Sequence, residues 1–253
     1  MEFDFKDKLI LVTGSTKGIG FNIAQKFLNL GAKVIITGRN FDKKKKLSLK
    51  KNYFFYKVNF QDLNSIKAFL KKIKLNELIP DIIVNNIGGN LNLKDPLIDS
   101  KKWLEVMNLN FFSTVEINNF IIPFMKKKNW GRICQISSLS AIENHGHPAY
   151  SAAKAALNAY VRSVGRYVSK YNIIMNAIMP GAVLTKDGYW DRIKKKDKKH
   201  FNYFLKERMA IGRFGNEDEI SNLVLYLCSD YCSFSVGSSY LVDGGLGRGF
   251  QNL

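Results

Sequence analysis

The sequence predicts an α/β fold, a doubly wound parallel sheet of about seven strands with helices on both faces. Short β-branched and apolar runs alternate along the chain with longer stretches whose apolar residues recur every three or four positions. Near-continuous apolar runs are typical of parallel strands buried on both faces, and the longer stretches are typical of amphipathic helices. Because regular alternation predicts βα units in one sheet, we expect a ligand crevice at the carboxyl ends of the strands.

The elements can be placed by their composition. The apolar runs predict strands at residues 8–13, 33–37, 53–58, 81–85, 131–137, 173–178 and 239–242. Segments such as 19–30 and 63–73 have helical spacing. No linker, repeat or Pro/Gly-rich break interrupts this pattern, and a chain of 253 residues that is 46% hydrophobic can fill one core. We therefore expect residues 1–253 to form a single domain.

The hydropathy pattern indicates where in the cell the protein works, and the spacing of the cysteines indicates whether it binds a metal. No run approaches the ~18 consecutive apolar residues of a membrane span, and the first residues lack the apolar core of a signal peptide. We therefore expect a cytoplasmic protein with no membrane partner. The cysteines, Cys134, Cys228 and Cys232, have no metal-ligand spacing, so no metal site is expected.

The chain carries a formal net charge of +18. Its lysine runs, at 43–46, 126–128 and 194–199, are separate and do not form one basic-aromatic motif. No helix-turn-helix, zinc spacing or RNA-binding signature accompanies them, so no nucleic-acid partner is expected. A solvated basic surface is the simplest interpretation, and an anionic substrate or an acidic carrier protein is the alternative.

A glycine-rich loop follows the first predicted strand and precedes the first helix. Glycines in such a loop let the backbone turn sharply and approach a pyrophosphate, and the following helix directs its N–H groups at that anion. We therefore predict a dinucleotide cofactor bound by Gly14, Ser15, Thr16, Lys17, Gly18, Ile19 and Gly20.

The end of the second strand indicates which dinucleotide. Many dinucleotide enzymes have an acidic residue here, which holds the ribose hydroxyls. This chain has Arg39 instead, and Lys17 in the glycine loop is a second cation. Two cations without a carboxylate favour a 2′-phosphate, and so predict NADP(H) rather than NAD(H).

Further motifs occur along almost the whole chain. They are Asn85-Asn86-Ile87-Gly88, Asn108, Ser137-Ser138, Tyr150-Ser-Ala-Ala-Lys154, Pro180-Gly181 through Thr185, and Val242-Asp-Gly-Gly245. In this order and spacing, together with the glycine loop, they resemble the short-chain dehydrogenase/reductase family in its roughly 250-residue branch, which includes 3-oxoacyl-carrier-protein reductases and sugar-pathway enzymes. The resemblance implies a Rossmann-type fold and hydride transfer between a nicotinamide and a carbonyl or secondary alcohol.

The resemblance also implies residue roles. Cofactor contacts are expected from Asn59, Phe60, Asn86, Ile87, Gly88, Pro180, Gly181, Val183 and Thr185, in addition to Tyr150 and Lys154. A homodimer or homotetramer is expected, paired through the tyrosine-bearing helix, where Ala152, Ala153, Ala155 and Ala156 permit close contact.

Tyr150 and Lys154 are four residues apart, so on a helix they share one face. A neighbouring ammonium and the positive charge of the oxidised nicotinamide both favour the phenolate, and we therefore expect Lys154, together with the cofactor, to lower the pKa of Tyr150. The resemblance makes Tyr150 the proton donor or acceptor, Ser138 its partner on the substrate oxygen, and Asn108 the residue that positions a proton-relaying water. Ser137 is the alternative to Ser138, because in family members the serine more often stands thirteen positions before the tyrosine.

The substrate is not fixed by the motifs. Residues 142–148 are expected to form a polar pocket wall through Glu143, Asn144, His145 and His147, and residues 186–210 are expected to form a lid over the substrate. A polar wall with a lysine-rich lid favours a sugar-like or phosphorylated carbonyl compound, whereas the motif set also fits a 3-oxoacyl carrier thioester. A non-catalytic NADP-binding sensor or scaffold is the competing class.

Overall fold

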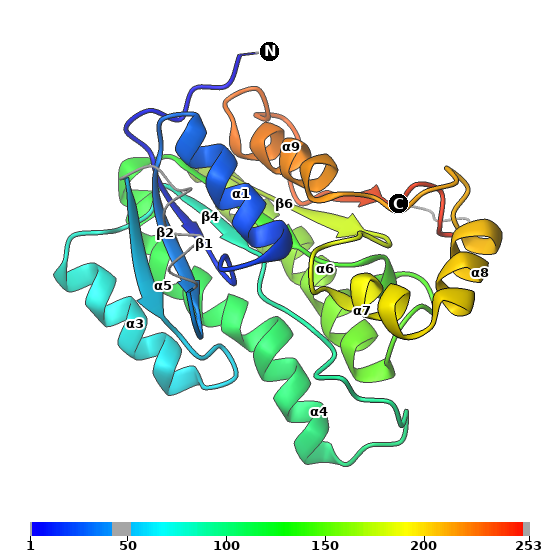
Figure 1. Ribbon diagram of the computed structural model, residues 1–253. Helices are drawn as coiled ribbons and strands as arrows, with labels where there is room; N and C mark the ends of the chain where they lie inside the picture. Colours follow the sequence, from blue (N-terminus) through cyan, green and yellow to red (C-terminus); the bar gives the residue numbers. More distant parts are fainter. Residues whose placement is uncertain (1, 42–51, 250–253) are drawn as a thin grey trace.

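The computed structural model describes residues 2–41 and 52–249, and within them one parallel sheet with the strand order β3-β2-β1-β4-β5-β6-β7. Figure 1 shows how the helices surround it. Each predicted strand is confirmed to within a few residues. The strands are β1 (Leu9–Val12), β2 (Lys33–Gly38), β3 (Tyr53–Lys57), β4 (Ile82–Asn85), β5 (Gly131–Ile136), β6 (Ile173–Pro180) and β7 (Ser239–Val242).

The helices alternate with these strands, as expected. The predicted segments 19–30 and 63–73 become α1 and α3. The helices are α1 (Gly18–Asn29), α3 (Leu63–Leu75), α4 (Ser100–Met107), α5 (Ser113–Lys128), α6 (Pro148–Val168), α7 (Tyr189–Lys196), α8 (Lys198–Arg208) and α9 (Glu217–Cys228).

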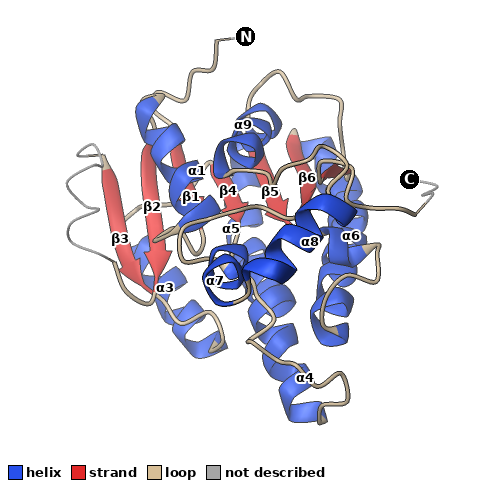
Figure 2. Ribbon diagram, turned by 45° about the vertical axis from the view of Figure 1, so that its right-hand side comes forward, coloured by secondary structure: helices blue, strands red, loops and turns tan. Residues whose placement is uncertain are grey.

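Two hydrophobic cores lie on opposite faces of the sheet. Alternate strand residues point to opposite faces, so Ile10 packs with α1 and α9 while its neighbour Leu11 packs with α3, α5 and α6. Figures 1 and 2 show this sandwich of two helical layers around the strands. The doubly wound parallel sheet predicted from the sequence is therefore confirmed.

A third, smaller core lies beside the carboxyl ends of the strands. It joins the helices α7 and α8 to the segments that follow β5, β6 and β7 (Figure 2). Its buried members are Leu139, Ala182, Trp190, Phe201, Phe204, Met209, Phe214 and Leu246. The region predicted as a lid thus has a hydrophobic core of its own.

The strand order reverses between β1 and β4, the position where open α/β sheets bind their ligands. In the described chain no helix is long and apolar enough to cross a membrane. The lysine run at 43–46 lies outside the described residues.

Candidate active site

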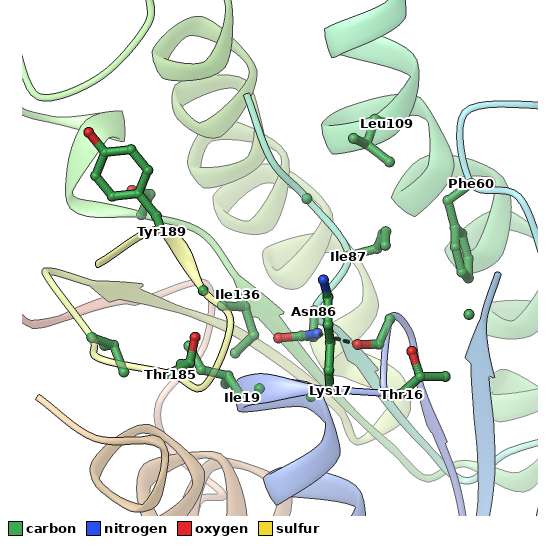
Figure 3. Close-up of a pocket in the computed structure, with 18 of the residues that line it drawn as sticks. Thr16, Lys17, Ile19, Phe60, Asn86, Ile87, Leu109, Ile136, Thr185 and Tyr189 are labelled. Atoms are coloured by element: carbon green, nitrogen blue, oxygen red, sulfur yellow. Dashed lines mark hydrogen bonds between the residues drawn. The ribbon is translucent and has the colours of Figure 1, made fainter. Parts of the chain in front are cut away.

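A cleft of about 730 Å³ opens at the carboxyl ends of the strands, where their order reverses. Figure 3 shows part of its lining. Nearly all the predicted site residues line it: Gly14, Thr16, Lys17, Gly18, Ile19, Gly20, Arg39, Asn59, Phe60, Asn86, Ile87, Gly88, Ser138, Tyr150, Lys154, Pro180, Gly181, Val183 and Thr185.

The glycine loop forms the floor of the cleft between β1 and α1. Gly14 and Gly18 have φ angles of +62° and +55°, which residues with a Cβ rarely adopt. A Cβ on Gly20 would lie 2.4 Å from Nδ2 of Asn86 and 2.6 Å from the carbonyl oxygen of Gly14. The loop therefore needs glycine for its conformation at two positions and for close packing at the third.

Asn86, at the end of β4, fastens this loop. Its side-chain Nδ2 donates to the carbonyl oxygens of Thr13 and Gly14 at 3.0 and 3.2 Å. In return, the Thr13 hydroxyl oxygen accepts the backbone N–H groups of Asn86 and Ile87 at 2.9 and 3.0 Å. The two loops at the strand-order reversal are thus one hydrogen-bonded unit, and Figure 3 shows Asn86 among the residues that line the cleft.

Two exposed cations, Lys17 and Arg39, lie on the cleft at the ends of the first two strands. Among its described lining residues the acidic side chain is Asp187, which belongs to the segment before α7 and not to the end of β2. Free N–H groups at the start of α1, close backbone approach and two cations fit a dinucleotide whose ribose carries a phosphate.

Helix α6 brings Tyr150 and Lys154 to the cleft. His147 caps the helix, since its Nδ1 accepts the N–H of Ala149 at 3.2 Å, and Pro148 occupies the first turn. The Lys154 side chain is 2% exposed, and its Nζ donates to the carbonyl oxygen of Ile136 at 2.8 Å. The predicted helical spacing of the tyrosine and the lysine is confirmed.

The ionisation of this pair differs from the expectation. Burial raises the pKa of Tyr150, and a hydrogen bond with Ser138 lowers it only in part. Burial also lowers the pKa of Lys154 to about 7, and its Nζ lies 5.6 Å from the tyrosine ring centroid. The prediction that the Lys154 ammonium lowers the pKa of Tyr150 is therefore wrong for this structure, because desolvation dominates both groups.

The structure separates the two candidate serines. Ser138 hydrogen-bonds the Tyr150 side chain, and its Oγ accepts the N–H of Ser140 at 3.1 Å. Ser137 also borders the cleft, but its hydroxyl donates to the carbonyl oxygen of Lys154 at 3.3 Å. Ser138 is thus the serine whose hydroxyl meets the phenol, in agreement with the preference from sequence.

Asn108 is not the asparagine beside the lysine. In the described structure it does not line the cleft, whereas Asn110 is fully buried. A Cβ on Gly88 would lie 2.8 Å from both Oδ1 of Asn110 and Nζ of Lys154, so these two atoms approach the same point. Both asparagines lie in a π-helical turn at Asn108–Phe112, of which Asn110 is buried, and spacing within the motif Asn-Leu-Asn could not choose between them.

A second prediction to correct is that of Ser15 as a residue that binds the cofactor. Its hydroxyl donates to the carbonyl oxygen of Val12 at 2.6 Å, and its backbone N–H donates to that of Thr37 at 2.9 Å. The residue is fully buried and is absent from the described lining. Ser15 therefore holds the loop against β2 and does not face the cofactor space.

The polar residues between Ser138 and Tyr150 also do not face the cleft. His145 packs on Phe204 of α8, with ring centroids 5.8 Å apart, and burial and then the charge of Arg208 lower its pKa. His147 is the helix cap, and its Nε2 lies 2.8 Å from the carbonyl oxygen of Asp95. None of residues 142–148 is in the described lining, so the predicted polar wall is wrong.

Apolar lining residues were missed by sequence reasoning. These are Leu91, Leu109 and Ile136, which border the cleft; Tyr189 and Trp190, at the start of α7, border it as well and belong to the segment predicted as the lid. Figure 3 shows Tyr189 at one end of the cleft and Phe60 at the other. Their motifs carry no polar signal, and Leu109 could be found only by knowing which side of the π-helical turn faces inward.

Comparison with known proteins shows similarity along nearly the whole chain. The family model described as enoyl-(acyl carrier protein) reductase matches residues 14–247. The chain is 34% identical over 264 residues to the 3-oxoacyl-[acyl-carrier-protein] reductase FabG of Aquifex aeolicus (strain VF5), covering 97% of this chain and 100% of that protein. It is 31% identical over 249 residues to FabG of Escherichia coli (strain K12), covering 96% and 98%.

Comparison with solved structures also shows similarity along nearly the whole chain. The L-sorbose reductase from Gluconobacter frateurii, complexed with NADPH and L-sorbose, has a TM-score of 0.88 to this chain at 28% identity. That alignment covers 97% of this chain and 98% of the reductase. The similarity therefore includes the strands that carry the cleft and the helices that close it.

Proposed function

The chain belongs to the short-chain dehydrogenase/reductase family and is an NADP(H)-dependent oxidoreductase that interconverts a carbonyl and an alcohol, and we propose that Tyr150, Ser138 and Lys154 are its catalytic residues. One observation carries this assignment. The phenol, the hydroxyl and the buried amine converge at one end of the cleft that holds the glycine loop and two cations. No observation favours a non-catalytic sensor or scaffold.

The cofactor is held by the residues that line the cleft. The glycine loop and the start of α1 receive the pyrophosphate, and Lys17 and Arg39 bind the 2′-phosphate. All the other predicted contacts border the same cleft, and following the family resemblance we assign Asn59, Phe60, Asn86, Ile87 and Gly88 to the adenosine side and Pro180, Gly181, Val183 and Thr185 to the nicotinamide side. NADP(H), when bound, supplies or accepts the hydride.

Tyr150 moves the proton. During reduction its phenol O–H donates to the substrate carbonyl oxygen, and during oxidation the phenol oxygen takes the hydroxyl proton back. Ser138 already hydrogen-bonds the phenol, so its hydroxyl is placed to hold the same substrate oxygen. The two hydroxyl groups fix the orientation of that oxygen before the proton moves.

In this proposal the Lys154 amine exchanges protons with the Tyr150 phenol. A pKa of about 7 means that its amine gains and loses a proton readily near neutral pH. Asn110 holds the chain beside it: Nδ2 donates to the carbonyl oxygen of Gly89 at 2.9 Å, and Oδ1 accepts the N–H of Gly89 at 2.9 Å. We assign the positioning role predicted for Asn108 to Asn110.

The substrate that best fits is a 3-oxoacyl thioester. The aligned Aquifex and Escherichia proteins are named 3-oxoacyl-[acyl-carrier-protein] reductases, and Leu91, Tyr189 and Trp190 give the cleft apolar and aromatic walls. A sugar-like ketone is the second candidate, because the L-sorbose reductase matches across the whole fold.

Cofactor titration followed by turnover tests the assignment. NADPH and NADH are titrated into the purified protein while nicotinamide fluorescence is recorded, and NADPH oxidation is then followed with acetoacetyl-CoA and with L-sorbose. Tyr150→Phe removes only the phenol oxygen, so we expect turnover to fall by about 10²–10⁴-fold while NADPH affinity is unchanged. Retained turnover in this variant removes Tyr150 from the mechanism.

The whole chain acts as one domain in this proposal, with residues 186–210 as its lid and with a homodimer or homotetramer as its assembly. Ala152 and Ala155 are exposed on α6 and are available to a second copy, whereas Ala153 is buried and is not. Light scattering at several protein concentrations tests the assembly.

Cys134, Cys228 and Cys232 form no disulfide, which suits a protein in the reducing cytoplasm.

A further inference from the structure

The loop that follows Ser138 is fastened to the C-terminal end of the described chain. Oε1 of Glu143 accepts the backbone N–H groups of Arg248 and Gly249 at 3.1 and 2.6 Å. Hydrogen bonds to a charged acceptor are the stronger kind, and here one carboxylate oxygen receives two. We call residues 243–249 the C-terminal strap.

The shape of the strap is specific for this contact. Both oxygens of the Asp243 carboxylate accept backbone N–H groups within the strap, from Gly245 at 3.0 Å and from Gly247 at 2.7 Å. A Cβ on Gly249 would lie 2.7 Å from Oε1 of Glu143. A side chain at residue 249 would therefore require the Glu143 carboxylate to shift from its present position.

The strap also reaches the lid. The guanidinium of Arg248 donates to the carbonyl oxygen of Glu207, near the end of α8, at 2.7 Å. Leu246 is 1% exposed and packs in the third core with Trp190 and Phe204. The same short segment thus touches α8, the core beneath the lid, and Glu143.

On the other side, Glu143 is tied to the catalytic serine. Its backbone N–H donates to the carbonyl oxygen of Leu139 at 3.1 Å, and Ser140 in the same turn donates its N–H to Oγ of Ser138. Glu143 therefore lies between the strap and the hydroxyl that meets Tyr150.

We propose that Glu143 is a positioning residue, which holds the Ser138 turn and the lid in one fixed arrangement by binding the C-terminal strap. The proposal rests on the proposed catalytic role of Ser138. Loss of the carboxylate frees the turn and the strap together, so the serine hydroxyl and the lid lose their common support. The cofactor loop lies on other elements and keeps its geometry.

A double-mutant cycle tests the contact. Glu143→Ala removes the acceptor, and Gly249→Ala pushes it away, so each alone is expected to lower kcat by about tenfold. The double variant is expected to be no worse than Glu143→Ala, because the added methyl then meets no carboxylate. Glu143→Gln keeps an acceptor oxygen and is expected to recover most of kcat. Glu105→Ala, a surface glutamate paired with Lys102, is the matched control.

Two readouts separate positioning from general damage. NADPH affinity, measured by fluorescence titration, is expected to be unchanged in all these variants. Acrylamide quenching of Trp190, in a background with Trp103→Phe and Trp130→Phe, is expected to increase in Glu143→Ala and in Gly249→Ala, because the core beneath the lid loosens. The quenching measurement needs no substrate.

Unchanged kcat and quenching in Glu143→Ala, or additive losses in the double variant, overturn the proposal. A parallel fall in NADPH affinity also overturns it, since the effect is then not confined to the substrate end. If the unsubstituted protein turns over neither acetoacetyl-CoA nor L-sorbose, the substrate assignment fails, whereas quenching in the cycle still decides whether the strap supports the lid.

Discussion

The buried amine of Lys154 makes a strong prediction about stability. The residue is 2% exposed, and its Nζ donates to a neutral acceptor, the carbonyl oxygen of Ile136. Burial lowers its pKa from 10.5 to about 7. The folded protein therefore holds this amine uncharged over a pH range in which the unfolded chain holds it charged.

The sign of the pH dependence follows directly. Between pH 7 and pH 10.5 the unfolded state binds one more proton at this site than the folded state, so the free energy of unfolding rises with pH. One pKa unit corresponds to about 1.4 kcal/mol, so the full range is worth about 5 kcal/mol. Between about pH 7.5 and 9.5 the gain is about 2.5 kcal/mol.

Lys154→Met isolates this contribution, because methionine has a similar length and does not titrate. Urea unfolding of the cofactor-free proteins is measured at several pH values and one protein concentration, since association would otherwise shift the apparent stability. We expect the unsubstituted protein to gain about 2.5 kcal/mol relative to the variant from about pH 7.5 to 9.5. A difference that stays flat with pH would falsify the claim that the folded protein holds the amine uncharged.

Three further predictions concern the cleft. Arg39→Asp replaces a cation that faces the cofactor space by an anion, so NADPH affinity should fall by about 10–100-fold while NADH binding is kept or improved; an unchanged ratio in fluorescence titration excludes Arg39 as the phosphate ligand. Asn110→Ala leaves both backbone groups of Gly89 without their partner. It should lower the free energy of unfolding in urea by about 1–3 kcal/mol and lower kcat, whereas Asn108→Ala should do neither. Equal effects of the two substitutions would refute the assignment of the positioning role to Asn110. Gly20→Ala places a methyl 2.4 Å from Asn86, so the loop must shift and NADPH binding should weaken, as isothermal titration can show.

The fold was predictable because strands and helices of this kind differ in local pattern. The run of β1 is apolar without interruption, and that of β4 is apolar up to its last residue, Asn85, since both strands are covered by helices on two faces. The glycine loop was equally clear, because a sharp turn and close backbone approach can be met only by glycine at Gly14, Gly18 and Gly20.

The site was less predictable where the role of a residue depends on which way its side chain points. Asn108 and Asn110 are two residues apart in one π-helical turn, and only the structure shows that Asn110 is the buried one whose Oδ1 approaches the same point as Nζ of Lys154. Ser15 lies within the glycine motif but turns its hydroxyl to β1. The pKa of Tyr150 could not be read from its spacing to Lys154, since burial outweighs the charge of a lysine that is itself desolvated.

The polar residues after Ser138 show how such a misreading bears on the substrate. From sequence they predicted a hydrophilic pocket, but His147 caps α6, His145 packs on the lid and Glu143 binds the C-terminal strap. Each is used to hold the catalytic turn, since backbone groups in a buried loop need partners. Leu91, which packs in the same small cluster as Tyr150, and the aromatic start of α7 border the cleft instead. Because an apolar wall leaves a hydroxyl group without a hydrogen-bond partner, these residues are the first to substitute when the proposed acyl thioester and the sugar-like ketone are compared as substrates.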